Sequence, residues 1–349
     1  MQQHNIAISD DFKKTAYNAI LSIALFVFVY LLLVLIGVCL TIACTYGGIM
    51  FIALRPSIIT VMLGLGIISM GVLIIIFLLK FIFAKHKVDR SHLIEISRTQ
   101  EPRLFELIGE IVEEVETNFP KKVYLSADVN AAVFYDSSFW SMFFPIKKNL
   151  QIGVGLINAV SVSEFKAILA HEFGHFSQRT MKVGSYVYNV NQIIYSLLHE
   201  NRSYNSMAQQ WASISGYFAI FVNIAVVFIK GIQWILKQVY DVVNLNYMRL
   251  SREMEFHADE VAANVAGSKP LITSLLRLDL ANHSYQIVLN YYGNKVAENI
   301  RASNIYPQQR YVMEFLARKS NLPVENNLPQ VTLDHLNRYN KSRLVIKDQ

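Results

Sequence analysis

Two long apolar runs dominate the N-terminal part of the chain. No charged residue lies between Lys14 and Arg55, and Ala19–Cys44 within that interval is almost wholly apolar. The second run, Ile58–Leu79, follows a short turn region. A helix needs about 20 such residues to cross a bilayer, and a cleaved signal peptide has an apolar core of only ~7–15. The pattern therefore predicts a retained transmembrane helical hairpin.

Two further apolar stretches follow in the middle of the chain. Val183–Leu198 lacks charge but contains several polar residues, whereas Ile214–Ile229 is strongly apolar and interrupted only by Asn223. If residues before and after this region build one site, the chain crosses the membrane here twice or not at all. We expect a hairpin that is wholly or partly embedded; the alternative is an amphipathic pair lying against the rest of the protein.

The remaining segments have the pattern of a folded polar domain. Pro102–Thr117 has apolar residues at helical spacing, and short strands are expected at Val123–Leu125, Ala131–Tyr135 and Leu150–Ile157. Ser161 and Glu164 form a capping box that opens the next helix. The alternating strand just before that helix fits a sheet edge that could pair with a peptide. Helices are expected again after Asp241, with segments such as 270–280 and 309–317.

These patterns divide the chain into six consecutive parts. They are a tail (1–18), a transmembrane hairpin (19–83), the first part of a catalytic domain (84–180), a middle helical hairpin (181–240), the second part of that domain (241–317), and a polar C-terminal tail (318–349).

Composition supports a membrane protein. Hydrophobic residues make up 53% of the 349 residues and charged residues only 17%, below the ~25% usual for soluble domains. The net charge of +6 needs no nucleic acid to explain it, because Lys and Arg gather beside the apolar runs. Basic clusters before the first run and after the second place both flanks in the cytoplasm. Cys39 and Cys44 lie in or beside the first run and indicate apolar packing, not a disulfide.

The candidate chemistry centres on His171-Glu172-Phe173-Gly174-His175, an H-E-x-x-H sequence in a helical segment. Residues four apart share a helix face, so the two imidazoles can bind one metal ion. Glu172 follows the first histidine and can reach a water on that metal. A catalytic zinc needs a third protein ligand and an open position, which this segment does not provide.

A second polar cluster, Ser251 to Asp259, offers the missing ligand. Glu255 and Asp259 are four residues apart and share a helix face. A carboxylate from Glu255 would complete a His/His/Glu site for one zinc ion. Asp259 could accept a hydrogen bond from the outer nitrogen of a ligating histidine and fix its tautomer.

Together these motifs resemble the HtpX-like and CAAX prenyl protease family of integral-membrane zinc metallopeptidases. The resemblance covers roughly residues 90–265 and rests on H-E-F-G-H, on S-R-x-x-E-F-x-A-D, and on Val129-Asn130-Ala131-Ala132, which is similar to the family's N-A motif. It implies a mainly α membrane protein with a zincin-like α+β catalytic domain and a small sheet. It also implies zinc on His171, His175 and Glu255, Asp259 as supporting acid, and substrate contacts at Asn130 and Ala131.

The chain departs from the family downstream. Members usually have a His-Pro segment ending in Arg and a late polar group that stabilises the oxyanion, but no His-Pro dipeptide occurs here. His283 and Arg310 are conceivable substitutes that the pattern does not favour. The chain could therefore be a shortened form of a longer protein or stabilise the transition state differently.

The expected activity is zinc-dependent endopeptidase, with Glu172 as general base and one Zn²⁺ per chain. Its partners would be protein or peptide substrates, such as misfolded or membrane proteins, and the lipid bilayer. The site would face the cytoplasm from a bacterial inner membrane. Alternatives are a CAAX-type processing protease, a signalling receptor with a similar zinc site, and a scaffold that keeps the metal without catalysis.

Overall fold

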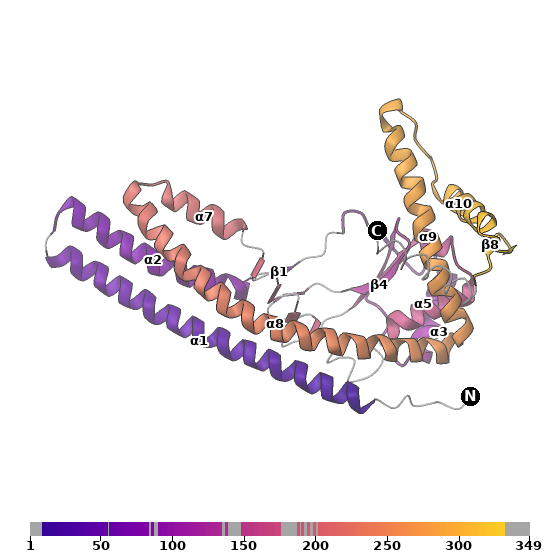
Figure 1. Cartoon of the computed structure of the whole chain (residues 1–349), viewed down its shortest axis with the longest axis horizontal. Coiled ribbons are helices and arrows are strands. Elements are labelled where there is room, and N and C mark those ends of the chain that lie inside the picture. Colours follow the sequence, from indigo (N-terminus) through magenta and orange to yellow (C-terminus); the bar gives the residue numbers. More distant parts are fainter. Residues whose placement is uncertain are drawn as a thin grey trace, which may run out of the picture.

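The computed structural model describes residues 9–54, 56–83, 85–86, 90–134, 137–138, 148–175, 187–188, 190–191, 194–195, 198–199 and 202–331. These residues form an elongated helical bundle joined to a smaller α+β part (Figure 1). Helices predominate and the largest sheet has four strands, which confirms the predicted fold class.

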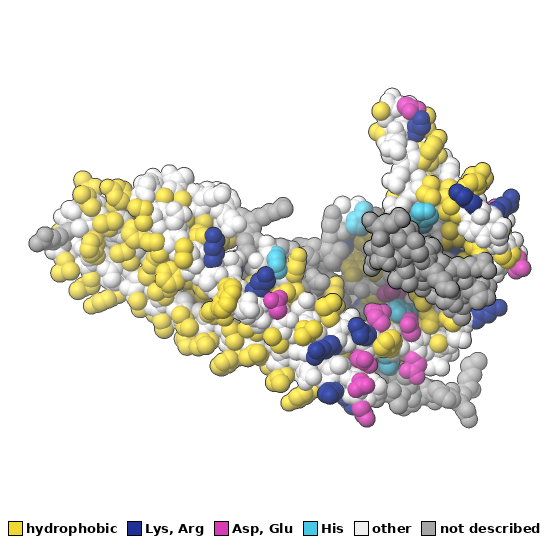
Figure 2. Space-filling view, in the orientation of Figure 1, with side chains coloured by type: hydrophobic (Ala, Val, Ile, Leu, Met, Phe, Trp, Pro, Cys, Tyr) yellow, Lys and Arg dark blue, Asp and Glu magenta, His cyan; other side chains and the backbone are white. Residues whose placement is uncertain are grey.

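The bundle is built on α1 (Asp10–Leu54), α2 (Ile58–Phe83) and the first half of α8 (Gly216–Ala266). Among the described residues, these three helices are long and apolar enough to cross a membrane. Their outward side chains are largely apolar, as the yellow surface along the bundle in Figure 2 shows. A surface of this kind is stable in lipid and costly in water, so the chain is a membrane protein.

Close packing joins the antiparallel helices α1 and α2. A side chain at Gly48 would meet the backbone oxygen of Gly64 at 2.7 Å, so the small residues let the two backbones approach. Two hydrogen bonds cross the same interface, from Thr41 to the Gly71 carbonyl (2.9 Å) and from Tyr30 to the Leu78 carbonyl (2.7 Å). The Tyr30 bond satisfies a donor that would otherwise be buried in an apolar setting, whereas the Thr41 hydroxyl also lies 2.8 Å from the Gly37 carbonyl of its own helix.

The described residues of the middle hairpin pack in the core of this bundle. Its first limb lies partly outside the described residues, but the described positions from 187 to 199 are helical. Four of them are buried at helical spacing in the bundle core: Val187, Val190, Ile194 and Leu198. After α7 (Arg202–Ala212), α8 begins at the Ser215 N-cap and continues unbroken past residue 240, where the sequence suggested a boundary.

The length of α8 connects the membrane to the site. Its 51 residues extend for about 76 Å, more than twice the ~30 Å hydrocarbon core of a bilayer. Only its first half can lie in the membrane. The second half runs beside the N-terminal turns of α1, with Leu250 and Met254 of α8 in one core with Phe12 and Ala16 (Figure 1).

The α+β part contains a sheet with strand order β2-β3-β6-β4. The strands are β2 (Ile94–Ile96), β3 (Lys122–Ser126), β4 (Ala131–Phe134) and β6 (Asn149–Gly153). β3 and β6 are parallel, whereas β2 and β4 pair antiparallel with their neighbours. The prediction that the strand before the metal helix forms an edge is wrong, because β6 lies between β3 and β4. It also ends at Gly153, and α4 (Val154–Ile157) follows.

Helices α3 (Pro102–Glu114) and α5 (Val162–Gly174) share one core with the sheet and the end of α8. α9 (Ser268–Lys295) projects from this part and is followed by η2 (Val296–Glu298) and α10 (Tyr306–Lys319) (Figure 1). Two short strand pairs complete the described structure: β1 (Lys85–His86) with β5 (Ser137–Ser138), and β7 (Val324–Glu325) with β8 (Leu328–Pro329). The predicted C-terminal tail thus begins with folded residues; 332–349 lie outside the described part, as do residues 1–8 of the N-terminal tail.

Candidate metal centre

The helix α5 begins with the capping box that the sequence predicted. Ser161 Oγ accepts the Glu164 backbone N–H (3.3 Å), and the Glu164 carboxylate accepts the Ser161 N–H (2.8 Å). The helix ends at Gly174, where it crosses α8. A Cβ at Gly174 would meet the Ala258 Cα at 3.1 Å, so glycine allows the two backbones to approach closely at the candidate site.

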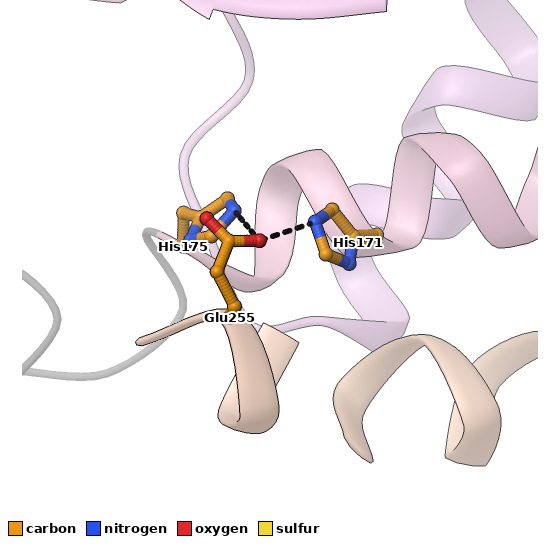
Figure 3. A group of neighbouring side chains, drawn as sticks. All are labelled: His171, His175 and Glu255. Atoms are coloured by element: carbon orange, nitrogen blue, oxygen red, sulfur yellow. Dashed lines mark ion pairs between the residues drawn. The ribbon is translucent and has the colours of Figure 1, made fainter. Parts of the chain in front are cut away.

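Three potential metal ligands meet at this crossing. The nearest nitrogen or oxygen atoms of His171, His175 and Glu255 all lie within 4.8 Å of one another. Glu255 Oε2 is 3.3 Å from His171 Nε2 and 3.8 Å from His175 Nε2, and both rings face it (Figure 3). Two imidazoles and a carboxylate around a tetrahedral zinc stand about 3.3 Å apart, given zinc–ligand distances of about 2.0–2.2 Å. The donor set and its spacing therefore fit a zinc ion.

Asp259 lies one turn after Glu255 and contacts the other side of the first histidine. Its Oδ1 is 2.9 Å from His171 Nδ1. A carboxylate in that position accepts the Nδ1–H and leaves Nε2, which faces Glu255, free to bind a metal. The structure thus brings Asp259 to the place that the motif spacing indicated.

Glu172 points to the edge strand of the sheet. The backbone N–H of Val133 in β4 hydrogen-bonds its carboxylate. Burial raises the pKa of Glu172 to about 7, although the neighbouring His171 acts in the opposite direction. A carboxyl group with a pKa near neutrality can both accept and return a proton, which is what a general base requires.

The strand β4 places Asn130 and Ala131 beside this site. β4 is the last strand of the sheet within the described residues, and its first residue is Ala131. Asn130 precedes it, and its carbonyl accepts the Gly153 N–H at 2.7 Å. Within the described residues β4 pairs only with β6, so its other side can take a further strand. The Asn130-Ala131 motif indicated an edge segment here, but no motif indicated the contact between Val133 and Glu172.

Two residues considered as oxyanion substitutes lie outside the ligand cluster. Arg310 donates to the Asn158 carbonyl at 2.7 Å and stabilises the packing of α10 on the loop after α4. His283 is exposed on α9. A contact that the sequence did not indicate is the buried ion pair of Arg277 with Glu164 (3.0 Å), which fixes α9 to the start of α5. The capping box identified Glu164, but no local signal identified its partner 113 residues away.

Fold and site together define a membrane protein whose helical bundle carries a peptidase-like His/His/Glu centre. The peptidase family M48 profile matches residues 98–279, more than half of the chain. The chain belongs to peptidase family M48.

Curated relatives named Protease HtpX are similar to parts of this chain. The relative from Vibrio parahaemolyticus is 25% identical over 191 residues, which is 52% of this chain and 59% of the relative. The relative from Acinetobacter baylyi is 28% identical over 137 residues, 37% of this chain and 41% of the relative. In these alignments the chain spans about half the length of its relatives. No solved structure matches it.

Proposed function

We propose that this protein is a membrane-bound, zinc-dependent endopeptidase. The observation that carries the proposal is the convergence of His171, His175 and Glu255 beside Glu172, next to a sheet edge that no other described strand covers. Membership of family M48 and the similarity to proteins named Protease HtpX support the same activity. The substrates would be misfolded or membrane proteins, because the site belongs to a chain with several candidate membrane spans.

Each residue of the site would have a distinct role in the reaction. His171, His175 and Glu255 would hold the zinc, and Asp259 would orient the first histidine. Bound zinc supplies Lewis acidity and a water that ionises near neutral pH. Glu172 would take a proton from the attacking water and give it to the leaving amine nitrogen.

The free edge of β4 would position the substrate. An extended peptide can form backbone hydrogen bonds with the edge of Ala131–Phe134 other than with the Val133 N–H, which already bonds Glu172 and so brings that carboxylate to the same edge. Such pairing depends mainly on the peptide backbone, which suits a protease that accepts many sequences. Asn130 would contact the peptide where it leaves the strand.

We place the active site on the cytoplasmic side of a bacterial inner membrane. The N-terminus of α1 and the C-terminus of α2 lie at the same end of the bundle as the α+β part (Figure 1), and Lys13, Lys14 and Lys80 lie near those two ends. In intact spheroplasts of a variant without Cys39 and Cys44, Ser57→Cys should react with an impermeant maleimide and Glu298→Cys should not. The opposite pattern would reverse the orientation.

The activity test uses the full chain in detergent with a casein-like unfolded substrate. Wild type should contain one zinc per chain, lose cleavage on chelation and recover it with zinc. Glu172→Gln should keep its zinc and lose cleavage by about 10²–10⁴-fold, the usual contribution of a general base. Glu110→Gln, an exposed acid on α3, is the matched control. Equal cleavage by Glu172→Gln and wild type would contradict the assignment.

A further inference from the structure

A cavity of about 500 Å³ lies between the start of β4 and one face of α9. One wall is the turn 128–130, which leads directly into β4. The opposite wall is α9, whose lining residues recur at positions 275, 278, 279, 282 and 286, the spacing of a single helix face. We call this space the α9 cavity. It is continuous with the proposed substrate strand and separate from the metal ligands.

The lining of the α9 cavity combines apolar surface with negative charge. Leu275 and Leu278 of α9 provide apolar contacts, whereas Asp128 and Asp279 face the space from opposite walls. Among the described residues that line it, none is Lys, Arg or His. The chain as a whole carries a net charge of +6, so the negative lining is a local feature.

One tyrosine hydroxyl in the cavity wall is available to a ligand. Tyr285 lines the cavity with most of its side chain buried, and its hydroxyl oxygen stays in contact with solvent. A polar group entering the cavity can replace water as the hydrogen-bond partner of that hydroxyl.

We propose that the α9 cavity binds a lysine or arginine side chain of the substrate, on the carboxyl-terminal side of the cleaved bond. Both side chains have a long apolar stem and a cationic, hydrogen-bond-donating head. The leucines would contact the stem, Asp128 and Asp279 would pair with the head, and Tyr285 could accept a hydrogen bond from it. The inference rests on the endopeptidase activity proposed above and adds a substrate preference to it.

The strand geometry determines which residue of the substrate enters the cavity. Glu172 meets β4 at Val133, and Asn130 at the cavity lies three residues earlier, about 10 Å along a strand. Antiparallel pairs are slightly more stable and more frequent than parallel ones. A peptide antiparallel to β4 runs from Val133 toward Asn130, so residues after the cleaved bond reach the cavity. The basic residue would lie about two to four positions after that bond.

The test compares peptides that differ at one position. Each of the four positions after the cleaved bond carries Lys, Gln or Glu in turn, and mass spectrometry verifies that the cleaved bond stays the same. At one of these positions, kcat/KM should be about tenfold or more higher for Lys than for Glu, because the two substrates reverse the charge facing two carboxylates. The ratio should shrink at high salt.

Variants assign the preference to the cavity. Asp128→Asn with Asp279→Asn should bring the Lys/Glu ratio close to one, and Asp279→Lys should favour Glu. Glu106→Gln with Glu110→Gln removes the same charge from the exposed face of α3 and should keep the wild-type ratio. The Glu172→Gln protein does not turn the peptides over, so their binding affinities can be measured directly on it. At the same position, the Lys peptide should bind more tightly than the Glu peptide.

The outcomes separate the two proposals. If the wild type cleaves these peptides with no Lys preference at any position, or if the double cavity variant keeps the preference, the cavity assignment is wrong and the endopeptidase remains. If no peptide is cleaved in a chelator-sensitive, Glu172-dependent manner, the proposed function itself fails.

Discussion

Replacing Arg277 with methionine should loosen the helix that carries the two histidines. Arg277 on α9 contacts Glu164, the third residue of α5, with Nε at 3.0 Å and 3.1 Å from the two carboxylate oxygens. Its NH1 also donates to the Pro329 carbonyl at 2.6 Å. The side chains are only 5% and 3% exposed, so the pair is shielded from water. Methionine keeps most of the apolar stem but leaves the Glu164 charge buried without its partner.

The expected loss in free energy of unfolding follows from these contacts. Breaking a buried ion pair by removing one partner costs about 3–5 kcal/mol. Glu164 keeps two other donors, the Ser161 N–H (2.8 Å) and Oγ (3.0 Å), which favours the lower end, about 3 kcal/mol. For a domain of 150–250 residues, each kcal/mol lowers Tm by about 2–4 °C, so Tm should fall by about 6–12 °C.

A double-mutant cycle tests whether the pair itself is responsible. Glu164→Gln preserves the capping box but leaves Arg277 unpaired, so it should also destabilise. The double variant should lose at least about 1.5 kcal/mol less free energy of unfolding than the two single variants lose in sum.

Calorimetry in detergent would follow Tm, and hydrogen exchange would compare α5 with α1 in the same molecule. Faster exchange in α5 with α1 unchanged is the expected pattern. A Tm shift below about 2 °C for Arg277→Met, or strictly additive effects, would refute the reasoning.

Two further changes test the site and the bundle. Asp259→Asn should weaken zinc binding about 10–100-fold, because the Asp259 carboxylate orients the proposed ligand His171. Competition with a chromophoric chelator measures the affinity, and the control Glu253→Gln should bind zinc as the wild type does. Equal zinc affinities for Asp259→Asn and wild type would show that Asp259 does not support the site. Gly48→Ala should lower Tm, because its methyl group would meet the Gly64 carbonyl oxygen at 2.7 Å. Gly47→Ala, whose methyl group would meet nothing within 4 Å, should leave Tm equal or higher. Equal Tm changes for the two variants would contradict close packing of α1 on α2 at Gly48.

Much of the helical architecture was predictable because its signals are local. The charge-free interval from Lys14 to Arg55 required a span, and the structure forms the single helix α1 there. The capping box at Ser161 located the start of α5 to the residue. The four-residue spacings of the two motifs placed candidate ligands on two helix faces, and the family assignment made from them is confirmed by the M48 match.

What the sequence did not predict depends on contacts between distant segments. β6 alternates as an edge strand does, yet β4 pairs with it from Ala131 to Phe134 and takes the edge position. Strand order follows from which segments meet in three dimensions, and the pattern of one strand does not contain it. The pairing of Arg277 with Glu164 and the cavity opposite Asp128 arise in the same way, because α9 returns to the sheet after the whole of α8.

The continuity of α8 has a consequence for how the site is held. Glu255 lies on the same helix as a candidate membrane span, whereas His171 lies on α5 and His175 caps its C-terminus, and α5 is packed in the α+β core. The three potential ligands therefore come from two helices with different packing partners, and the distances between the ligands depend on how α5 crosses α8. Gly174 against Ala258 fixes that crossing at close range, and the contact of Asp259 with His171 spans it a second time. A shift of α8 along its axis by one residue, about 1.5 Å, would change the distances from Glu255 to both histidines, so the packing of the bundle and the geometry of the metal centre are mechanically linked.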